Sequence, residues 1–521
     1  MDNPAYIAEV ENASGAHKHD KSQVYAHTME EALDLVQVGR FHYTLMLTCG
    51  ICFLTVMAEM TAIGIIMPLI KCDLAATQAE QGILASAGFF GVVFSSHMVG
   101  FLADTWGRLR ILRCSLILAA IVTIISTFSV NTWMLITFRF LNGFFICGGQ
   151  ACVFSYIGEF HSNRTRVRHI TLLAISLPLA FILSSAVALV LLPLRFNFTI
   201  IGLPFTPWRI FLLFNAFLSF LGLLGLSTLP ETPKYVLVHG DHDAALDILR
   251  RIYSTNTGDK AENYPVKSIV LQTGGATLAN IHGVKDALKM IWKQTTPLFY
   301  RERVLQTLNL SFCLFMIYAL SQGLFMWFPT ILNELIAKRG EDARMCKILG
   351  NMNLTVTEAN ANSNCELDYF TLQVLMMMGA VFTVIFIIYA YTIDIIGKVN
   401  MLIIWFVICC ICAIVVHWLS NFAATVTALI LFLAIGNCGG IIGTLTTEFY
   451  PTQINAMGMC FVMMIGRLGS VAGGNIVGLT IFNHCDGLFW GFVAITVTLI
   501  ALATVLPEQK REKKVNNSAA K

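Results

Sequence analysis

The chain has 521 residues, of which 56% are hydrophobic and only 12% are charged, and its formal net charge is +3. A soluble globular protein carries about 25% charged residues, because a surface that faces water must be covered by polar groups. The composition therefore excludes a soluble enzyme and predicts a protein whose outer surface faces lipid. The small net charge, without a basic stripe, gives no support for a nucleic-acid partner.

Residues 1–42 are polar and contain several acidic side chains, which the apolar region of a signal peptide does not tolerate. We therefore expect a cytosolic tail at 1–42 and no cleaved signal peptide. A membrane-spanning helix needs about 20 consecutive, mostly apolar residues. Twelve stretches meet this requirement: 43–70, 82–103, 110–130, 133–157, 170–193, 208–229, 305–333, 371–393, 399–418, 422–446, 457–481 and 487–506. The predicted fold is an all-α membrane protein with twelve transmembrane helices.

A polar interval at 230–304 divides the twelve helices into two sets of six. We predict an N-terminal six-helix bundle at 43–229, a cytosolic linker at 230–304, a C-terminal six-helix bundle at 305–506 and a cytosolic tail at 507–521. The linker is expected to form short amphipathic helices at 241–253 and 284–292. It contains no phosphate loop, nucleotide motif or catalytic triad spacing, so we expect no nucleotide, no cofactor and no enzymatic activity.

Lys and Arg favour the cytosolic ends of short loops. Arginines follow the second and fourth predicted helices, so both termini are expected in the cytosol and the loop at 334–369 on the extracellular or luminal side. In that loop, Asn353 begins a glycosylation sequon. Cys346 and Cys365 lie on either side of it, and the oxidising environment makes them a disulfide candidate. The other cysteines fall mostly in apolar runs, where they pack as small hydrophobic residues, and no metal site is predicted.

Matching residues stand at corresponding helix boundaries of the two halves. Asp394 lies 290 residues after Asp104 (394 − 104), and Glu448 lies 289 residues after Glu159 (448 − 159). Features that recur at nearly one offset predict two pseudo-repeated six-helix bundles. Such parallel repeats, with a substrate site between them, are a known architecture for secondary transport.

The repeated boundaries also predict a cytosolic gate. Charged side chains there can form hydrogen bonds that hold the gate shut in one state and break in another. The alternative is that the arginines only set the topology. Arg467 has two alternative roles, which are to attract an anionic solute or to contact Glu448. Its position fairly near the cytosolic end favours the contact with Glu448. The predicted gate residues are Gly100, Asp104, Gly107, Arg108, Glu159 and Arg166 in the first half, and Asp394, Gly397, Lys398, Glu448 and Arg467 in the second.

Ionisable residues inside the bilayer are costly and are functional candidates by default. Glu59 in the first helix and Arg139 in the fourth are such residues, and both are expected in the outer half of the first bundle. A buried carboxylate beside a movable arginine can couple conformation to protonation; the alternative is a static ion pair. Tyr318, Gln322 and Trp327 in the seventh helix combine aromatic faces with hydrogen-bonding groups and are candidates for a substrate cavity wall.

The motifs resemble a known family. The spacing G-x-x-x-D-x-x-G-R that begins at Gly100 matches the signature loop of the major facilitator superfamily. The segments VFSYIGEF at 153–160, PWRIF at 207–211 and TTEFYPT at 446–452 resemble synaptic vesicle glycoprotein 2, which places the chain with that group and the organic-ion transporters. Three features depart from the pattern: a short outer loop after the seventh helix, no arginines after YPT, and a short acidic tail.

The resemblance implies a monomeric, multi-pass transporter that moves a small organic solute or organic ion by alternating access, in the plasma membrane or a secretory or synaptic vesicle membrane. The solute site is expected at mid-depth between the bundles, and coupling to H⁺ or Na⁺ is left open. The alternative is a membrane protein that acts as a binding or trafficking partner and retains only vestigial transport.

Overall fold

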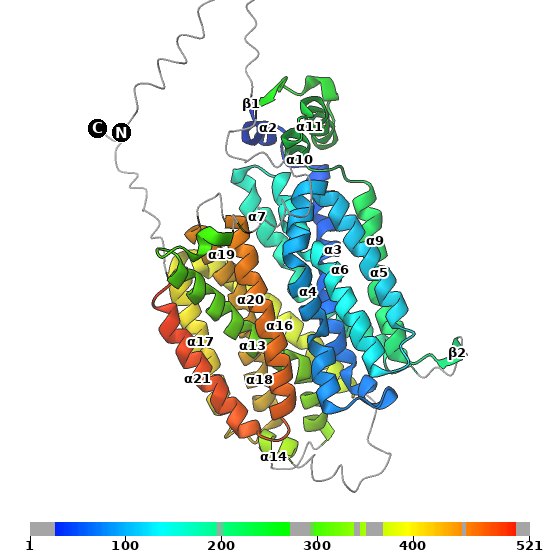
Figure 1. Cartoon of the computed structure of the whole chain (residues 1–521), viewed down its shortest axis with the longest axis vertical. Helices are drawn as coiled ribbons and strands as arrows, with labels where there is room; N and C mark the ends of the chain where they lie inside the picture. The colour runs from blue at the N-terminus through cyan, green and yellow to red at the C-terminus, as the bar shows by residue number, and fades with distance from the viewer. Residues whose placement is uncertain are drawn as a thin grey trace, which may run out of the picture.

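The structure is a computed structural model of the chain. It describes residues 27–194, 199–200, 202–270, 292, 295–337, 344–350, 368–450 and 455–506. Within these residues, twelve helical spans are long and apolar enough to cross a membrane, which confirms the predicted fold class. The helices lie in two bundles side by side (Figure 1).

The first bundle contains seven helical segments that make six spans. They are α3 (Arg40–Asp73), α4 (Gln78–Trp106), α5 (Arg108–Ser126), α6 (Thr132–Glu159), α7 (Asn163–Ala174), α8 (Ser176–Leu191) and α9 (Pro207–Ser227). The second bundle contains α13 (Val304–Ala337), α16 (Tyr369–Ile396), α17 (Lys398–Val415), α18 (Phe422–Leu433), η4 (Ala434–Asn437), α19 (Cys438–Phe449), α20 (Asn455–Thr480) and α21 (Cys485–Ala503). The tenth span is thus α18 and α19 joined by a 3₁₀ turn.

Local sequence signals account for several helix ends. Thr77 begins α4 with a capping box, in which its hydroxyl accepts from Glu80 N (3.3 Å) and Glu80 Oε2 accepts from Thr77 N (2.9 Å). Asn131 caps α6 by accepting a hydrogen bond from Met134 N (2.8 Å). These caps satisfy backbone donors that would otherwise have no partner at the start of each helix.

Glycines allow close helix packing within each bundle. A Cβ atom at Gly143 of α6 would overlap the backbone of Gly88 in α4, and one at Gly469 of α20 would overlap the backbone of Phe315 in α13. Such close backbone approach through small residues is the usual way in which membrane helices associate, because lipid supplies no hydrophobic driving force. α4 is therefore tightly packed on α6, and α13 on α20.

A small module of helices and strands covers one end of the first bundle (Figure 1). It contains α2 (Met29–Leu35), α10 (Pro233–Val238), α11 (His242–Thr257), η1 (Ala261–Asn263), and the parallel strands β1 (His27–Thr28) and β4 (Ile269–Val270). We call this end of the bundles the α11 end. The opposite end, which we call the α14 end, carries α14 (Met345–Gly350), β2 (Thr199–Ile200) and β3 (Leu203–Pro204). The short helix η3 (Thr296–Phe299) precedes α13.

The linker forms one of the two amphipathic helices that its pattern predicts. α11 covers 241–253 almost completely and buries Ala245, Leu246, Leu249 and Ile252. The second predicted helix, at 284–292, lies outside the described residues apart from residue 292. The buried face of α11 thus holds the module together.

The two bundles contact each other toward the α14 end. Asn475 Nδ2 of α20 donates to Ser86 Oγ of α4 (2.9 Å), and Gln78 Nε2 donates to the carbonyl of Gly478 (2.5 Å). The rings of Phe181 in α8 and Phe325 in α13 are 5.0 Å apart. These contacts join the two bundles near their α14 end.

The predicted pairing of Cys346 with Cys365 is wrong, because Cys346 forms a disulfide with Cys485. Cys346 lies in α14, and Cys485 is the first residue of α21; their Cα atoms are 5.3 Å apart. α14 packs against α21, which brings together two cysteines that are 139 residues apart in sequence. Cys365 and the sequon at Asn353 lie outside the described residues.

Candidate functional site

Glu59 and Arg139 form a buried ion pair between α3 and α6. Arg139 Nη1 lies 3.0 Å from Glu59 Oε2, and the exposed fractions of the Arg139 and Glu59 side chains are 3% and 0%. Their placement follows the expectation that both lie in the first bundle within reach of each other. Because neither charge contacts water, each is stabilised by its partner and by the polar groups around it.

Three further residues complete this polar network. Thr123 Oγ1 donates to Glu59 Oε1 (2.7 Å), and Arg139 Nη2 donates to Ser126 Oγ (2.5 Å). Asn142 Nδ2 donates to Thr123 Oγ1 (2.7 Å), which links α6 to α5. These three residues are not among those that the sequence pattern predicts for the site. Hydroxyl residues three apart in α5 were an available signal, but uncharged polar residues are too common in membrane helices to single out.

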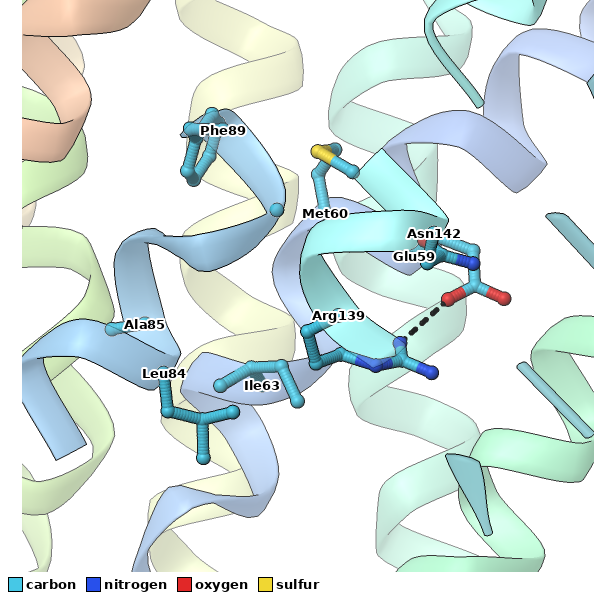
Figure 2. Close-up of a pocket in the computed structure, with 9 residues that line it drawn as sticks. Glu59, Met60, Ile63, Leu84, Ala85, Phe89, Arg139 and Asn142 are labelled. Carbon is cyan, nitrogen blue, oxygen red and sulfur yellow. Dashed lines mark hydrogen bonds and ion pairs between the residues drawn. The ribbon is translucent and has the colours of Figure 1, made fainter. Parts of the chain in front are cut away.

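The network borders a small pocket, which Figure 2 shows in close-up. Leu84 and Phe89 project from α4 on one side of the pocket, and the Glu59–Arg139 pair lies on the other. The lining residues are Glu59, Met60, Ile63, Leu84, Ala85, Gly88, Phe89, Arg139 and Asn142. The pocket is therefore mostly apolar, with one ion pair and one amide as its polar groups.

Arg467 lies near the middle of α20, twelve residues from the start of the helix at Asn455. Its Cζ atom is 5.8 Å from the centre of the Phe89 ring in α4 and 5.6 Å from that of the Tyr318 ring in α13. Both distances fall within the range of cation–π contacts. Since α4 belongs to the first bundle and α20 to the second, the guanidinium lies at the junction of the two halves.

The expectation that Arg467 contacts Glu448 is wrong. Glu448, at the α11 end of α19, forms an ion pair with Lys398 at the start of α17. Among the ion pairs of the described residues, Arg467 takes part in none. The pairing partner of Glu448 is decided by the packing of α17 beside α19, which brings the Lys398 side chain within reach.

The three candidates on the seventh span have different surroundings. Tyr318 is partly exposed and faces Arg467. Gln322 is also partly exposed and makes no hydrogen bond within the described residues. Trp327 is only 1% exposed, and its Nε1 donates to the carbonyl of Gly474 (2.9 Å). Trp327 therefore joins α13 to α20 rather than lining a water-filled wall.

In the first bundle, the predicted gate residues meet at the α11 end. Arg108 Nη1 lies 2.7 Å from Glu159 Oε1, and Nη2 lies 3.5 Å from Asp104 Oδ1. Gly107 joins α4 to α5 with φ +97°, a conformation that favours glycine. Gly100 plays a smaller part than expected, since a Cβ built there would meet nothing within 4 Å.

Arg166 lies beside this cluster but binds different groups. Its Nη2 donates to Glu30 Oε1 of α2 (2.8 Å), and its Nε donates to the carbonyl of Gly158 (2.9 Å). Arg166 therefore connects the module at the α11 end to the transmembrane helices. The backbone amide of Leu109 donates to both carboxylate oxygens of Glu231 (3.1 and 3.2 Å), so Glu231 stabilises the start of α5.

The second bundle repeats the main features. Gly397 joins α16 to α17 with φ +91°, as Gly107 joins α4 to α5, and the Lys398–Glu448 pair corresponds to Arg108–Glu159. Asp394 lies in α16, three residues before Gly397, and its side chain is outside the described part of the structure. The repeat is therefore present in the backbone turn and in one ion pair of each half.

Comparison with known proteins agrees with this architecture. The family model of the Major Facilitator Superfamily matches residues 49–474. Similar curated proteins are synaptic vesicle glycoprotein 2A from Pongo abelii, 26% identical over 62% of this chain and 46% of that protein, and synaptic vesicle glycoprotein 2B from Homo sapiens, 25% identical over 61% and 49%. The chain thus aligns with about half the length of these relatives.

Solved structures of transporters share the fold. A partially occluded, inward-open form of the xylose transporter XylE from E. coli superimposes with a TM-score of 0.65 at 13% identity, covering 90% of this chain and 98% of that one. A mutant of the nucleoside transporter NupG gives 0.59 at 12% identity, with coverages of 90% and 100%. Together with the twelve apolar spans and the repeated turns, these matches identify the chain as an integral, multi-pass membrane protein of the Major Facilitator Superfamily.

Proposed function

We propose that the chain is a secondary transporter that moves a small organic anion by alternating access between its two bundles. The observation that carries this proposal is the position of Arg467. Its guanidinium lies near the middle of α20, at the junction of the two halves, and takes part in none of the ion pairs of the described residues.

A charge at this depth is costly unless it is compensated. Arg139 has a buried carboxylate partner, whereas Arg467 contacts the aromatic rings of Phe89 and Tyr318. The planar guanidinium suits a carboxylate, sulfonate or phosphate, to which it can donate two parallel hydrogen bonds. The neighbouring rings provide apolar surface for the rest of the solute. These features favour an organic anion over a neutral sugar or a cation.

The Glu59–Arg139 pair supports coupling to protons. A buried carboxylate that loses its arginine partner binds a proton more readily, so a movement of α6 relative to α3 would change proton affinity. The alternative is a static pair that fixes α3 to α6. Coupling to Na⁺ has no comparable support among the described residues, because Glu59 is already occupied by Arg139 and Thr123.

Orientation follows from the basic loops. Arg108, Arg110 and Arg113 begin α5 at the α11 end, and Arg164, Arg166 and Arg168 lie near the start of α7 at the same end. We infer from the positive-inside rule that the α11 end faces the cytosol and the α14 end the opposite compartment. The disulfide at the α14 end agrees with an oxidising environment there.

Uptake into proteoliposomes that contain the purified full-length chain tests the solute class. Radiolabelled phthalate, xylose and tetraethylammonium serve as an anion, a neutral sugar and a cation. We expect saturable phthalate uptake by the wild type, a loss of at least about tenfold in Arg467→Gln, and partial retention in Arg467→Lys. Arg250→Gln removes a partly exposed arginine of α11, outside the transmembrane spans, and is the matched control.

Uptake of xylose or tetraethylammonium without phthalate would contradict the anion assignment. Equal phthalate uptake by wild type and Arg467→Gln would also contradict it. If no solute of any charge class enters, the remaining function is that of a binding or trafficking partner, a role compatible with the similarity to synaptic vesicle glycoprotein 2.

A further inference from the structure

Phe89 lies near two charged sites of the membrane region, which are the Glu59–Arg139 ion pair and the Arg467 guanidinium. Its side chain lines the pocket that contains the Glu59–Arg139 pair, and its ring centre lies 5.8 Å from Cζ of Arg467. It is only 3% exposed, so the ring lies in the packed interior. Figure 2 shows Phe89 on α4, across the pocket from Glu59 and Arg139.

No hydrogen bond or ion pair of the described residues joins Arg467 directly to Glu59 or Arg139. The two centres also belong to different bundles. Phe89 lines the pocket of the ion pair and also faces the Arg467 guanidinium. Because the interior is close-packed, a shift of its ring would affect its neighbours on both sides.

The helix that carries Phe89 is tightly packed on the helix that carries Arg139. A Cβ built at Gly88 would lie 3.8 Å from the carbonyl oxygen of Arg139 and 3.5 Å from Cε of Met60. Met60 follows Glu59 in α3. Gly88, the neighbour of Phe89, therefore lies close to the backbone of Arg139 and to Met60, so a movement of α4 at Phe89 would reach both.

We propose that Phe89 is a positioning residue that couples Arg467 to the Glu59–Arg139 pair. This rests on the proposed function. When a solute anion binds the Arg467 guanidinium, it competes with the cation–π contact to Phe89 and shifts the ring. The shift changes the pocket wall against which Glu59 and Arg139 pack. Solute binding at the bundle junction thereby alters the ion pair in the first bundle.

The side chains around the Glu59 carboxylate include few charged groups, so an effect of Arg467 on the ion pair can be measured. Arg139 from α6 is the one charged group of the described residues that faces the Glu59 carboxylate; α5 contributes the hydroxyl of Thr123 and α4 contributes apolar side chains. A change at Arg467 that is carried by packing would reach Glu59 through Phe89, whose ring lines the same pocket.

A triple-mutant cycle on the purified full-length chain, without solute, tests the proposal. The midpoint temperature of unfolding is measured for Glu59→Gln, Arg467→Gln and the double variant, each with Phe89 and with Phe89→Leu. Distant sites without a shared partner give additive effects. With Phe89 present, we expect the double variant to depart from the sum of the single shifts by about 2 °C. With Phe89→Leu, we expect additivity.

Controls separate coupling from loss of packing. Phe94→Leu changes a ring on the same helix that is 62% exposed, and it should leave the departure from additivity unchanged. Phe89→Tyr keeps the ring and should keep the coupling. Phe89→Met replaces Phe89→Leu if the leucine variant does not fold. A merely structural role of Phe89 would lower every midpoint without changing the interaction between the two sites.

Additive effects with Phe89 present would overturn the proposal, and so would an equal departure from additivity in the Phe89→Leu background. Because the measurement needs no solute, it remains decisive even if the uptake experiment finds no transport. If phthalate is not taken up but the mutant cycle shows coupling, only the solute assignment is rejected. If phthalate is taken up but the mutational effects are additive, only the role of Phe89 is rejected.

Discussion

The Glu59 carboxylate and the Arg139 guanidinium lie 3.0 Å apart with side-chain exposures of 0% and 3%. Each therefore depends on the other for its charge to be tolerated. The pair also crosses from α3 to α6, so its strength is set by how these two helices pack. Thr123 and Ser126 of α5 supply the remaining hydrogen bonds, which makes α5 the support of the pair.

Removing one charge of this pair should destabilise the protein more than removing both. Glu59→Gln or Arg139→Gln leaves an uncompensated buried charge, and each should cost about 3–5 kcal/mol. The double variant should cost less than the sum of the two. Thermal unfolding of the purified chain measures this. The pair Asp247–Arg250, whose side chains are 71% and 38% exposed, is the control and should contribute less than about 1 kcal/mol. Additive costs at Glu59 and Arg139 would show that the two charges are independently satisfied.

Proton coupling predicts a specific loss in Glu59→Gln. A pH gradient that is acidic on the side of entry should accelerate phthalate uptake into proteoliposomes by the wild type, because protons move with the solute. Glutamine cannot exchange a proton, so uptake by the variant should no longer respond to the gradient. Exchange of unlabelled for labelled phthalate at equal pH should persist, since it needs no net proton movement. A gradient response that survives in Glu59→Gln would assign the pair a static role.

The disulfide between Cys346 and Cys485 should stabilise the α14 end of the second bundle. Replacing Cys346 by Ser should lower stability by about 2–5 kcal/mol, because the bond closes a loop between residues 139 apart. Cys485→Ser should have the same effect, and the double variant should be no worse than either. Peptide mapping under non-reducing conditions should recover the two segments as one cross-linked species. A cross-link from Cys346 to any other cysteine would contradict the assignment.

The burial of His161 at the α11 end should make the stability of the protein sensitive to acid. Burial lowers the pKa of His161 from 6.5 to about 4, with His42, His169 and Arg166 as nearby positive or titratable groups. Between these two values the unfolded chain binds the proton and the folded chain does not. Stability should therefore fall as pH drops from 6.5 to 4, by about 3 kcal/mol at most.

His161→Gln should flatten this part of the pH profile, because glutamine does not titrate and can still donate to the carbonyl of Ile157, which lies 2.8 Å from His161 Nδ1. Unfolding midpoints measured across pH 4–7 for both proteins check the prediction. The exposed His242→Gln serves as control and should follow the wild-type profile. A parallel profile for His161→Gln would place the acid sensitivity elsewhere.

The amino-acid sequence determined the twelve spans and the repeat, because both depend on local properties. Apolar length decides whether a segment can cross a bilayer whatever its neighbours are. Gly107 and Gly397 mark the same turn in each half, because the backbone there needs a positive φ. Glu59 and Arg139 stood out for a similar reason: a charge within an apolar run is costly in any fold and requires a partner.

The partners of Cys346, Glu448 and Arg467 depend on which helices lie side by side, and only the tertiary structure decides that. Nearness in sequence favoured Cys365 for Cys346, but the packing of α14 on α21 brings Cys485 to it. Glu448 binds Lys398, which leaves Arg467 facing Phe89 and Tyr318 from two other helices. The type of a residue determines what kind of partner its side chain needs. The packing of helices in both bundles determines which residue becomes that partner.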